Sequence, residues 1–269
     1  MKKFFSLILV VSLSAYSLNA QVIDKVKLRI HYATKFRVWE NTKGMRQDEK
    51  VLDLGTTSSK FYSLWETRYW EIVDSVAKHG GSMQNALAHS PYPRSYDCYV
   101  VYKNYPIKGE LTYTDKLLQD FIYQESMEKP VWRLVKGKDS IVANYRCQKA
   151  QTKYRGKVWN VWYTIDISIS DGPWKLYGLP GLILKVEDQD GNFVFECIQI
   201  ENMNNTAMSI PKKKYLKCSR EQLKQAKCKM GEDPEAYYKQ VTGLNPGQGY
   251  DANGKPLKYT SRKPALLEY

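Results

Sequence analysis

Three histidines and two aspartates are the side chains of this sequence that come nearest to a hydrolytic site. A serine hydrolase would need one of His31, His79 and His89 beside a nucleophile, yet the chain has no G-x-S-x-G motif to present one. Asp166 and Asp171 could form an acid–base pair, but they lie at the end of an amphipathic strand pattern, where solvent-facing acids are ordinary. An enzyme would therefore need a dispersed site, in which Asp166, Asp171 or His31 hydrolyses peptides or cell-wall material.

Short motifs of other enzymes are present only in part. The segments 75–78 and 209–212 match S-x-x-K, a pattern that is common by chance, and the companion motifs of the serine–lysine acyl enzymes are missing. The sequence contains no glycine-rich phosphate loop. We therefore expect no catalytic residue and no cofactor.

Asp188, Asp190, Asn192 and Glu196 have the side-chain types of a calcium loop, but their spacing does not fit one. An EF-hand needs its glycine after the third ligand position, and Gly191 stands before it. An Asp-Gly pair supplies the positive φ angles that tight hairpins need. The sequence therefore predicts a hairpin turn here, and it predicts no metal site.

The chain has five cysteines: Cys98, Cys147, Cys197, Cys218 and Cys228. An odd number cannot all pair within one chain, although one or two disulfides would suit an oxidising compartment. The absence of a C-x-x-C motif argues against a zinc ribbon or a redox site. Cys218 and Cys228 are excluded as a pair, because the helix predicted between them would separate their α-carbons by about 15 Å, beyond the limit of about 7 Å.

The first 20 residues form a predicted signal peptide. Lys2 and Lys3 precede an apolar stretch at 4–13, and small or polar residues lead to Ala20. A retained membrane anchor is the alternative, but the stretch is shorter than the ~20 residues of a spanning helix. We expect cleavage after Ala20 and a mature protein in the periplasm.

Charge and composition limit the class of protein. The chain has 269 residues, of which 43% are hydrophobic, and its net charge is +13. Removal of the leader would leave 39 basic against 28 acidic residues, a net charge of +11. This composition supports one substantial core and excludes a disordered tail, a disulfide miniprotein and a polytopic membrane protein. The basic charge would favour binding to anionic lipid or acidic polymer. The alternative is that the lysines serve solubility alone. Nucleic acid is not an expected partner, because the protein is predicted to be exported.

Alternation of apolar and polar residues predicts most of the strands. Residues 25–38 alternate apolar and basic side chains, which indicates one long antiparallel strand. Its basic face is expected to be a solvated sheet face, with binding of an anionic partner as the alternative. A second alternating strand is expected at 159–169, and Leu182–Asp188 with 193–200 should form a hairpin. Further strands are predicted at 96–105, 121–126, 131–135 and 141–149.

Helical signals are fewer. Apolar residues at helical spacing predict an amphipathic helix over 61–76. Ser219 opens a capping box before a helix that runs towards Gly231. Asp233 followed by Pro234 predicts a short helix to 241, which ends near Gly243.

Together these elements predict a mainly β (α+β) fold. We expect one domain over 21–244, built on a curved antiparallel sheet with a few covering helices, followed by an irregular segment at 245–269. By analogy of fold alone, the sheet would be an open half-barrel similar to those of periplasmic lipoprotein carriers.

One apolar heptapeptide, at 177–183, combines proline and glycine just before the predicted hairpin. Pro180 and Gly181 suit the two central positions of a type II turn, in which Gly181 would have a positive φ. The segment is expected to be either a structural corner or an apolar lip for a ligand or partner. The residues proposed for that contact are Trp174, Tyr177, Gly178, Leu179, Pro180, Gly181, Leu182 and Ile183.

The hexamer at 178–183 and its context resemble the GLPGLI family. Similar residues occur at 162–164, 167, 172–175, 145–150 and 156–157, and an early match lies at 52–61. Lys157 stands where an arginine is commoner. The resemblance implies a secreted envelope protein of Gram-negative bacteria, with genes often beside outer-membrane transport systems. It implies no activity, cofactor or catalytic residue.

The sequence thus favours a binding protein over an enzyme. Aromatic residues make up 13% of the chain, and such rings suit binding grooves as well as sheet cores. We expect a non-enzymatic periplasmic protein whose concave sheet face binds an apolar or peptide-like ligand, or an envelope partner. The alternatives are an accessory protein of an outer-membrane transport system and the hydrolase with a dispersed site.

Overall fold

The computed structural model describes residues 20–82, 84, 90–247, 255–256 and 260–269. The predicted signal peptide therefore lies outside the described residues, apart from Ala20, and so does His89. Within the described part, no helix is long and apolar enough to cross a membrane.

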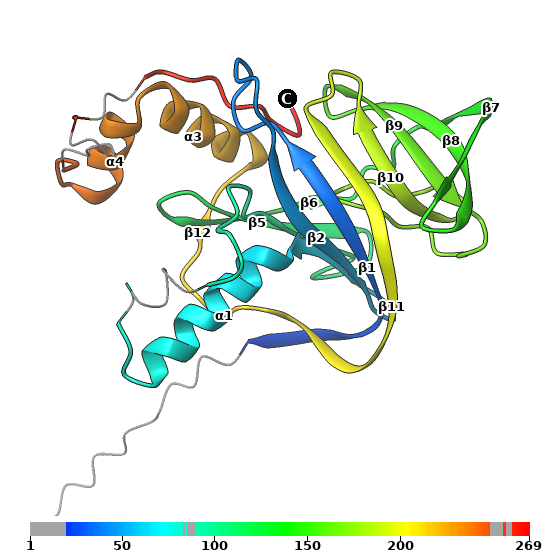
Figure 1. Ribbon diagram of the computed structural model, residues 1–269, viewed down its shortest axis with the longest axis horizontal. Coiled ribbons are helices and arrows are strands. Elements are labelled where there is room, and N and C mark those ends of the chain that lie inside the picture. The colour runs from blue at the N-terminus through cyan, green and yellow to red at the C-terminus, as the bar shows by residue number, and fades with distance from the viewer. Residues whose placement is uncertain (1–19, 83, 85–89, 248–254, 257–259) are drawn as a thin grey trace, which may run out of the picture.

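Twelve strands form one continuous sheet in the described chain, and three helices accompany it (Figure 1). The strands are β1 (Gln21–Phe36), β2 (Arg46–Leu54), β3 (Ser59–Ser63), β4 (Val100–Lys103), β5 (Glu110–Lys116), β6 (Asp120–Ser126), β7 (Arg133–Val142), β8 (Tyr145–Tyr154), β9 (Lys157–Thr164), β10 (Leu182–Asp188), β11 (Phe193–Ile210) and β12 (Leu216–Lys217). The helices are α1 (Leu64–Lys78), α3 (Arg220–Glu232) and α4 (Pro234–Thr242).

The sheet consists of two antiparallel meanders joined at their long strands. Its order is β12-β6-β5-β4-β3-β2-β1-β11-β10-β9-β8-β7. The first meander runs from β1 to β6 and the second from β7 to β11, and β1 pairs with β11 to unite them. The short strand β12 adds a parallel pair to β6. The predicted mainly β fold with an antiparallel sheet is confirmed.

The sheet is strongly curved and remains open. Strands β6 and β7 lie near its opposite edges, yet only residues 127–132 connect them. Such a connection spans at most about 25 Å, so the two edges must bend towards each other. Register shifts along the β1–β11 pair add local twist, and Figure 1 shows the two meanders facing each other across the long central strands.

Strand β1 has the predicted alternation, but its second face is not a free basic surface. Arg29 forms an ion pair with Asp53, with Nε 2.6 Å from Oδ1. The His31 Nδ1 lies 2.7 Å from Glu49 Oε1. Acidic residues on the neighbouring strand β2 therefore neutralise part of the face that the sequence suggested for an anionic partner. The opposite face is core, with residues below 5% exposure at Val26, Ile30, Tyr32 and Phe36.

The helix caps follow the sequence closely. Ser219 and Gln222 form the predicted capping box of α3. Asp233 caps α4, and Gly243 ends it with φ of 73°. Helix α1 begins later than predicted, because Phe61 belongs to β3 and Ser63 provides the cap.

Several predicted strands have wrong bounds, among them those expected at 96–105, 131–135 and 193–200, and for two others the reason is clear. The strand expected over 159–169 ends at Thr164, after which local turns take over, with the Ile169 amide donating to the Ile167 carbonyl at 2.8 Å. The strand expected over 141–149 is interrupted by the β7–β8 hairpin. Ala143 and Asn144 both have positive φ there, 48° and 68°, as a type I′ turn requires.

The inner face of the sheet is filled by the protein's own side chains. Most of its large members are aromatic, and those below 5% exposure include Tyr32, Phe61, Tyr99, Tyr113, Tyr123, Trp159, Trp174, Phe193 and Phe195. Leu223 from α3 and Leu267 join the same core. A ligand could therefore reach this face only by displacing an element that covers it.

Candidate binding groove

The residues singled out in the 174–183 segment are largely part of the core. Trp174, Leu182 and Ile183 are fully buried, and Leu179 is 3% exposed. Gly181 is also buried, whereas Tyr177 and Gly178 are half-buried and Pro180 is exposed. The structure thus leaves Tyr177, Gly178 and Pro180 as the part of the segment that a partner could touch, and such contact stays a prediction.

The corner in this segment is built differently from the predicted type II turn. Gly181 does not have a positive φ; Gly178 does, at 96°. Gly181 is needed for a close approach instead, because a β-carbon on it would lie 1.9 Å from the carbonyl oxygen of Thr164. The expectation for Gly181 was wrong because sequence alone does not reveal which backbone passes beside a glycine.

The structure does not bring the proposed hydrolytic residues together. His31 contacts Glu49 and Glu201, while Asp171 pairs with Lys103 from β4. Asp166 lines a separate surface pocket beside the β7–β8 hairpin. Within the described chain, no hydrogen bond or ion pair joins any two of His31, Asp166 and Asp171. His79 only closes the end of α1, where its Nδ1 lies 2.7 Å from the Ser75 carbonyl.

The Asp188 carboxylate has a structural role in the β10–β11 hairpin. It accepts hydrogen bonds from the backbone amides of Asn192 and Phe193, both at 2.7 Å. Lys157 Nζ donates to its other oxygen at 3.0 Å. Gly191 has φ of 66°, so the Asp-Gly hairpin predicted from the sequence is confirmed.

All five cysteines are free. Burial raises the pKa of Cys147 to about 11 and that of Cys197 to about 12. These thiols are core residues that stay protonated at neutral pH.

The most distinctive site is a groove between the sheet and α3, and it is occupied by the chain itself. Residues 262–269 run from α3 across the top of the sheet to the second meander (Figure 1). Two cavities of about 50 and about 90 Å³ adjoin this segment, and both are lined by Asp97, Phe193, Lys227, Ala265 and Leu266. We refer to the space that holds 264–268, together with these cavities, as the groove.

Backbone hydrogen bonds hold the segment in an extended form beside the end of β1. The Ala265 amide donates to the Val38 carbonyl at 3.0 Å, and the Glu40 amide donates to the Lys263 carbonyl at 2.9 Å. Pro264 and Trp39 form an isolated antiparallel bridge between these bonds. The segment therefore binds in the way that an added strand binds a sheet edge.

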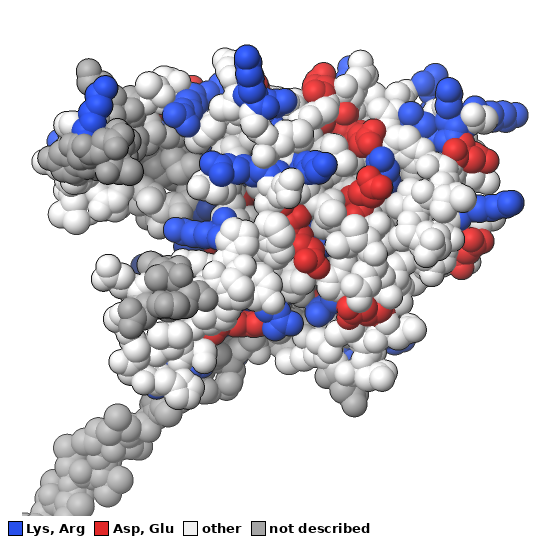
Figure 2. All heavy atoms as spheres, viewed as in Figure 1, with Lys and Arg blue, Asp and Glu red and all other residues white. Residues whose placement is uncertain are grey.

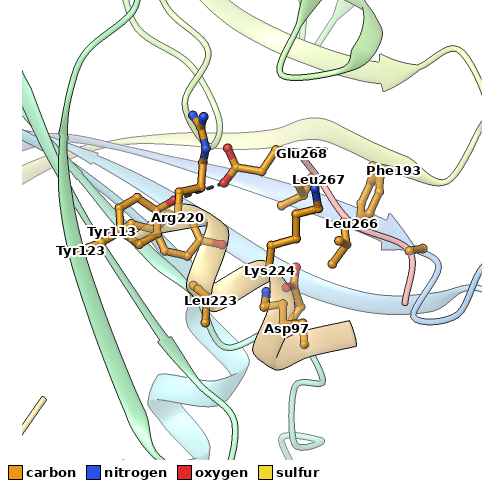
Figure 3. A pocket seen from close by; sticks show the side chains of 12 residues that line it. Asp97, Tyr113, Tyr123, Phe193, Arg220, Leu223, Lys224, Leu266, Leu267 and Glu268 are labelled. Atoms are coloured by element: carbon orange, nitrogen blue, oxygen red, sulfur yellow. Dashed lines mark hydrogen bonds between the residues drawn. The ribbon is translucent and has the colours of Figure 1, made fainter. Parts of the chain in front are cut away.

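The side chains of the segment enter the groove. Leu266 and Leu267 are 9% and 8% exposed. Glu268 extends past them to Tyr123, whose hydroxyl donates to the Glu268 carboxylate at 3.2 Å (Figure 3). Tyr113 and Tyr123 stack with ring centroids 4.9 Å apart, so the floor of the groove is aromatic with a polar end.

A buried ammonium lies at that polar end. Lys175 has no exposed side-chain surface, and its Nζ is 2.8 Å from Glu125 and 2.8 Å from Glu268. It also donates to the Tyr123 hydroxyl at 2.8 Å. Burial, followed by the charges of Glu268 and Glu125, raises the pKa of Tyr123 well above its usual range, so the hydroxyl keeps its proton. Lys175 thus anchors the acidic residue of the segment.

The fixed wall of the groove has more cations than carboxylates. Arg155 Nη2 lies 3.3 Å from Glu125, and Arg220 Nη1 lies 3.2 Å from the same carboxylate. Lys175 is the third cation around Glu125. Without Glu268, three cations would therefore share Glu125 and the largely exposed Glu128, which favours an acidic occupant.

Sequence reasoning did not identify this site. Lys175 was singled out only as part of the GLPGLI resemblance, and Glu268 lies in the segment expected to be irregular. The one available signal is the pattern Ala265-Leu266-Leu267-Glu268-Tyr269, an apolar run that ends in an acid and an aromatic residue within an otherwise polar stretch.

Comparison with protein families gives a match over part of the chain. A family model described as "N-glycanase peptide, N-terminal domain" matches residues 107–224, a range that includes Glu125, Lys175 and the 178–183 hexamer. No curated protein sequence matches the chain. The resemblance to the GLPGLI family, drawn from the hexamer, stays a prediction.

Solved structures show distant similarity. Two crystal forms of PNGF-II, in space groups P21 and C2, are each 14% identical, with a TM-score of 0.47, over 74% of this chain and 32% of theirs. MucB in complex with MucA(peri) is 9% identical, with a TM-score of 0.24, over 66% of this chain and 51% of its own. The chain thus spans about a third of the length of PNGF-II and about half that of MucB.

Proposed function

We propose that the protein is a non-enzymatic binding module of the bacterial envelope, exported to the periplasm, whose groove holds an extended peptide-like segment with apolar and acidic side chains. Membership of the GLPGLI family and cleavage of the 1–20 leader are parts of this proposal. The observation that carries it is the way in which the groove holds residues 264–268, with backbone bonds along one edge and Glu268 on the buried Lys175.

The contacts of the segment specify the chemistry of the ligand. Hydrogen bonds to Val38 and Glu40 require an extended backbone. The positions of Leu266 and Leu267 require two apolar side chains. Lys175 and the arginines around Glu125 require an acidic group after them. An envelope protein that presents such a segment is the partner that this groove fits, and a component of an outer-membrane transport system is the candidate that the family resemblance implies.

The distribution of charge supports a peptide rather than a long polyanion. Figure 2 shows the lysines and arginines of one face interspersed with acidic groups instead of gathered in one patch. Nucleic-acid sites usually gather basic residues along a continuous surface. The excess of cations that matters for this proposal is local, and it lies inside the groove.

The separation of His31, Asp166 and Asp171 supports a binding role over a hydrolytic one. Each of the three has its own environment, and Asp171 is already neutralised by Lys103. A general acid–base pair needs its two groups within reach of one substrate. We therefore place the function in the groove rather than in these residues.

The decisive experiment removes the native occupant and supplies it again as a peptide. A chain that ends at Ser261 should bind the labelled synthetic peptide RKPALLEY, which is residues 262–269, with saturable fluorescence anisotropy. The same peptide with Glu268→Lys should bind at least tenfold more weakly, because it places an ammonium beside Lys175. The intact chain serves as the control, since its groove is filled, and it should not bind the peptide.

A folded chain lacking 262–269 that does not bind the peptide would contradict the proposal. If the shortened chain does not fold, a protease site can be introduced at the exposed residues 260–261 of the intact protein. After cleavage of the folded protein, the labelled peptide should exchange into the groove. A cleaved, folded protein that retains its segment and admits no peptide would also contradict the proposal.

A second candidate function follows from the match with the N-glycanase domain over 107–224. A module of that kind would recognise a peptide that carries an N-linked glycan. Isothermal titration of the shortened chain with one glycopeptide and its deglycosylated form separates the two candidates. Tighter binding of the glycosylated form would favour the second candidate, and equal binding would favour a groove that reads the peptide alone.

A further inference from the structure

A second pocket lies on the outer face of β3 and β4 beside α1, and it shares Asp115 and Lys116 with the wall of the groove. It has a volume of about 320 Å³. Phe61 of β3 points into the core with no exposed surface, so its neighbours in the strand, Lys60 and Tyr62, face the outer side. The wall of this pocket combines the rings of Tyr62, Trp70, Tyr102 and Tyr215 with the charged side chains of Glu66, Asp115, Lys116, Asp120 and Lys213. Each of the three carboxylates has a partner other than Lys60: Trp70 for Glu66, Lys227 for Asp115 and Lys213 for Asp120.

Lys60 differs from the buried lysines of the chain in its partners. Among the described residues, four lysines are below 9% exposure, and each has a carboxylate within 4 Å of Nζ: Lys50, Lys103, Lys157 and Lys175. For Lys60, no carboxylate of the described residues lies that close. Its Nζ donates one long hydrogen bond, 3.3 Å, to the Ser209 carbonyl. It also lies 4.4 Å from the Tyr62 ring and 5.6 Å from the Tyr102 ring.

The acidic group whose charge acts on Lys60, Asp53, is already engaged. Asp53 accepts hydrogen bonds from Arg29 Nε at 2.6 Å and from Arg29 Nη2 at 2.9 Å. The Tyr62 hydroxyl donates to the same carboxylate at 3.1 Å. The charge of Asp53 is therefore largely neutralised, and the Arg29 guanidinium adds a positive charge near Lys60.

These surroundings favour the neutral amine. Burial and the positive charge of Arg29 lower the pKa of Lys60 to about 8, although the negative charge of Asp53 opposes them. Near neutral pH, a much larger share of Lys60 side chains is then unprotonated than of ordinary lysines. An unprotonated amine that lines an open pocket is a nucleophile.

We propose that Lys60 is a reactive amine at which this pocket captures small aldehydes that carry an apolar or aromatic ring. The Nζ lone pair attacks the carbonyl carbon, so that a C–N bond forms, the C=O π bond breaks and the oxygen takes up the proton that the nitrogen loses. The resulting carbinolamine then loses its oxygen as water and leaves an imine. When protonated, the imine is a cation that lies beside the Tyr62 and Tyr102 rings, which stabilise it. This proposal does not rest on the proposed function.

Reductive trapping tests the proposal on the intact protein. The folded chain is incubated with benzaldehyde at pH 7.5, the imine is reduced with cyanoborohydride, and the modified lysines are identified by peptide mapping. Lys60 should be modified at least tenfold faster than Lys185, whose pKa is raised by its bonds to Glu187 and Glu196 despite the opposing effect of burial. The rate at Lys60 should rise with pH to a half-maximum near 8.

Controls separate a special environment from general lysine chemistry. Lys60→Arg should remove the fast adduct, and Lys185→Arg should leave its rate unchanged. In urea, the preference for Lys60 should disappear, because it depends on the folded pocket. Modification of Lys60 no faster than that of Lys185 in the folded wild-type protein would overturn the proposal, and this comparison holds even if Lys60→Arg fails to fold.

Discussion

Glu268→Gln is the most informative single change in the groove. The substitution keeps the size of the side chain and one oxygen for Lys175, but it removes the charge that faces a fully buried ammonium. Lys175 keeps Glu125 at 2.8 Å and the Tyr123 hydroxyl at 2.8 Å. The variant therefore isolates the second carboxylate of the cluster rather than leaving the lysine without a partner.

The expected loss in the free energy of unfolding is about 2 kcal/mol. A hydrogen bond to a charged group contributes about 1.5–3 kcal/mol, and the complete loss of a buried partner costs about 3–5 kcal/mol. Because Glu125 remains and the amide oxygen of glutamine still accepts a hydrogen bond, the lower range applies. A loss of about 2 kcal/mol corresponds to a decrease in Tm of about 4–8 °C for a protein of this size.

Urea unfolding followed by tryptophan fluorescence measures the effect. Glu221→Gln is the matched control, because Glu221 is 60% exposed and contacts Lys224 at 3.5 Å, and such surface pairs contribute less than about 0.5 kcal/mol. In a Lys175→Met background, Glu268→Gln should cost far less than in the wild type. Equal effects of Glu268→Gln and Glu221→Gln, or the same cost of Glu268→Gln with and without Lys175, would refute the reasoning.

Three further predictions concern other parts of the molecule. Gly181→Ala should destabilise the protein by more than about 3 kcal/mol in urea unfolding, because its β-carbon would overlap the Thr164 carbonyl. Burial alone would raise the pKa of Asp24, but hydrogen bonds from neighbouring backbone amides lower it to about 2 from 3.8. The contribution of Asp24 to the free energy of unfolding is therefore fully present above about pH 4 and is lost as the pH falls towards 2. Solvent screening limits it to about 1 kcal/mol or less, measurable as the difference between wild type and Asp24→Asn over this pH range. Thiol titration should find five free cysteines after unfolding, with Cys147 and Cys197 unreactive in the native state.

The elements that could be predicted from the sequence are those whose signals are local. Strand β10 has the predicted bounds, Leu182–Asp188, because a turn limits it on each side. The cap of α3 at Ser219 and that of α4 at Asp233 were also predicted correctly. In these cases the side chains that define the element lie within a few residues of it.

Other strands escaped prediction because polar residues occupy their inner positions. In β2, Asp48 and Lys50 are buried, at 2% and 0% exposure, so the strand does not show an apolar alternation. The lysine is held by its contacts with Asp48 and Asp97. The turn at Ala143 and Asn144 could not be predicted either, because alanine rarely has a positive φ.

The groove could not be predicted for a different reason. Lys175 and Glu268 are 93 residues apart in the chain, and neither belongs to a motif of binding residues. Their contact depends on the curvature of the sheet and on the path of residues 262–269 across it. Only the fold brings such groups together, whereas the turn at Gly191 could be predicted from two adjacent residues.

The pairing of β1 with β11 has a consequence for how the chain acquires its structure. Phe36 pairs with Phe193 at one end of this ladder, so its formation closes a loop of roughly 160 residues, which makes it slow compared with the hairpins on either side. Until that step, the first meander exposes β1 as a bare edge of 16 residues, where another unfinished chain could pair. During synthesis from the N-terminus, β1 is made first but cannot pair with β11 until most of the chain has been made. The yield of folded protein should therefore depend on how well β1 is shielded in that interval.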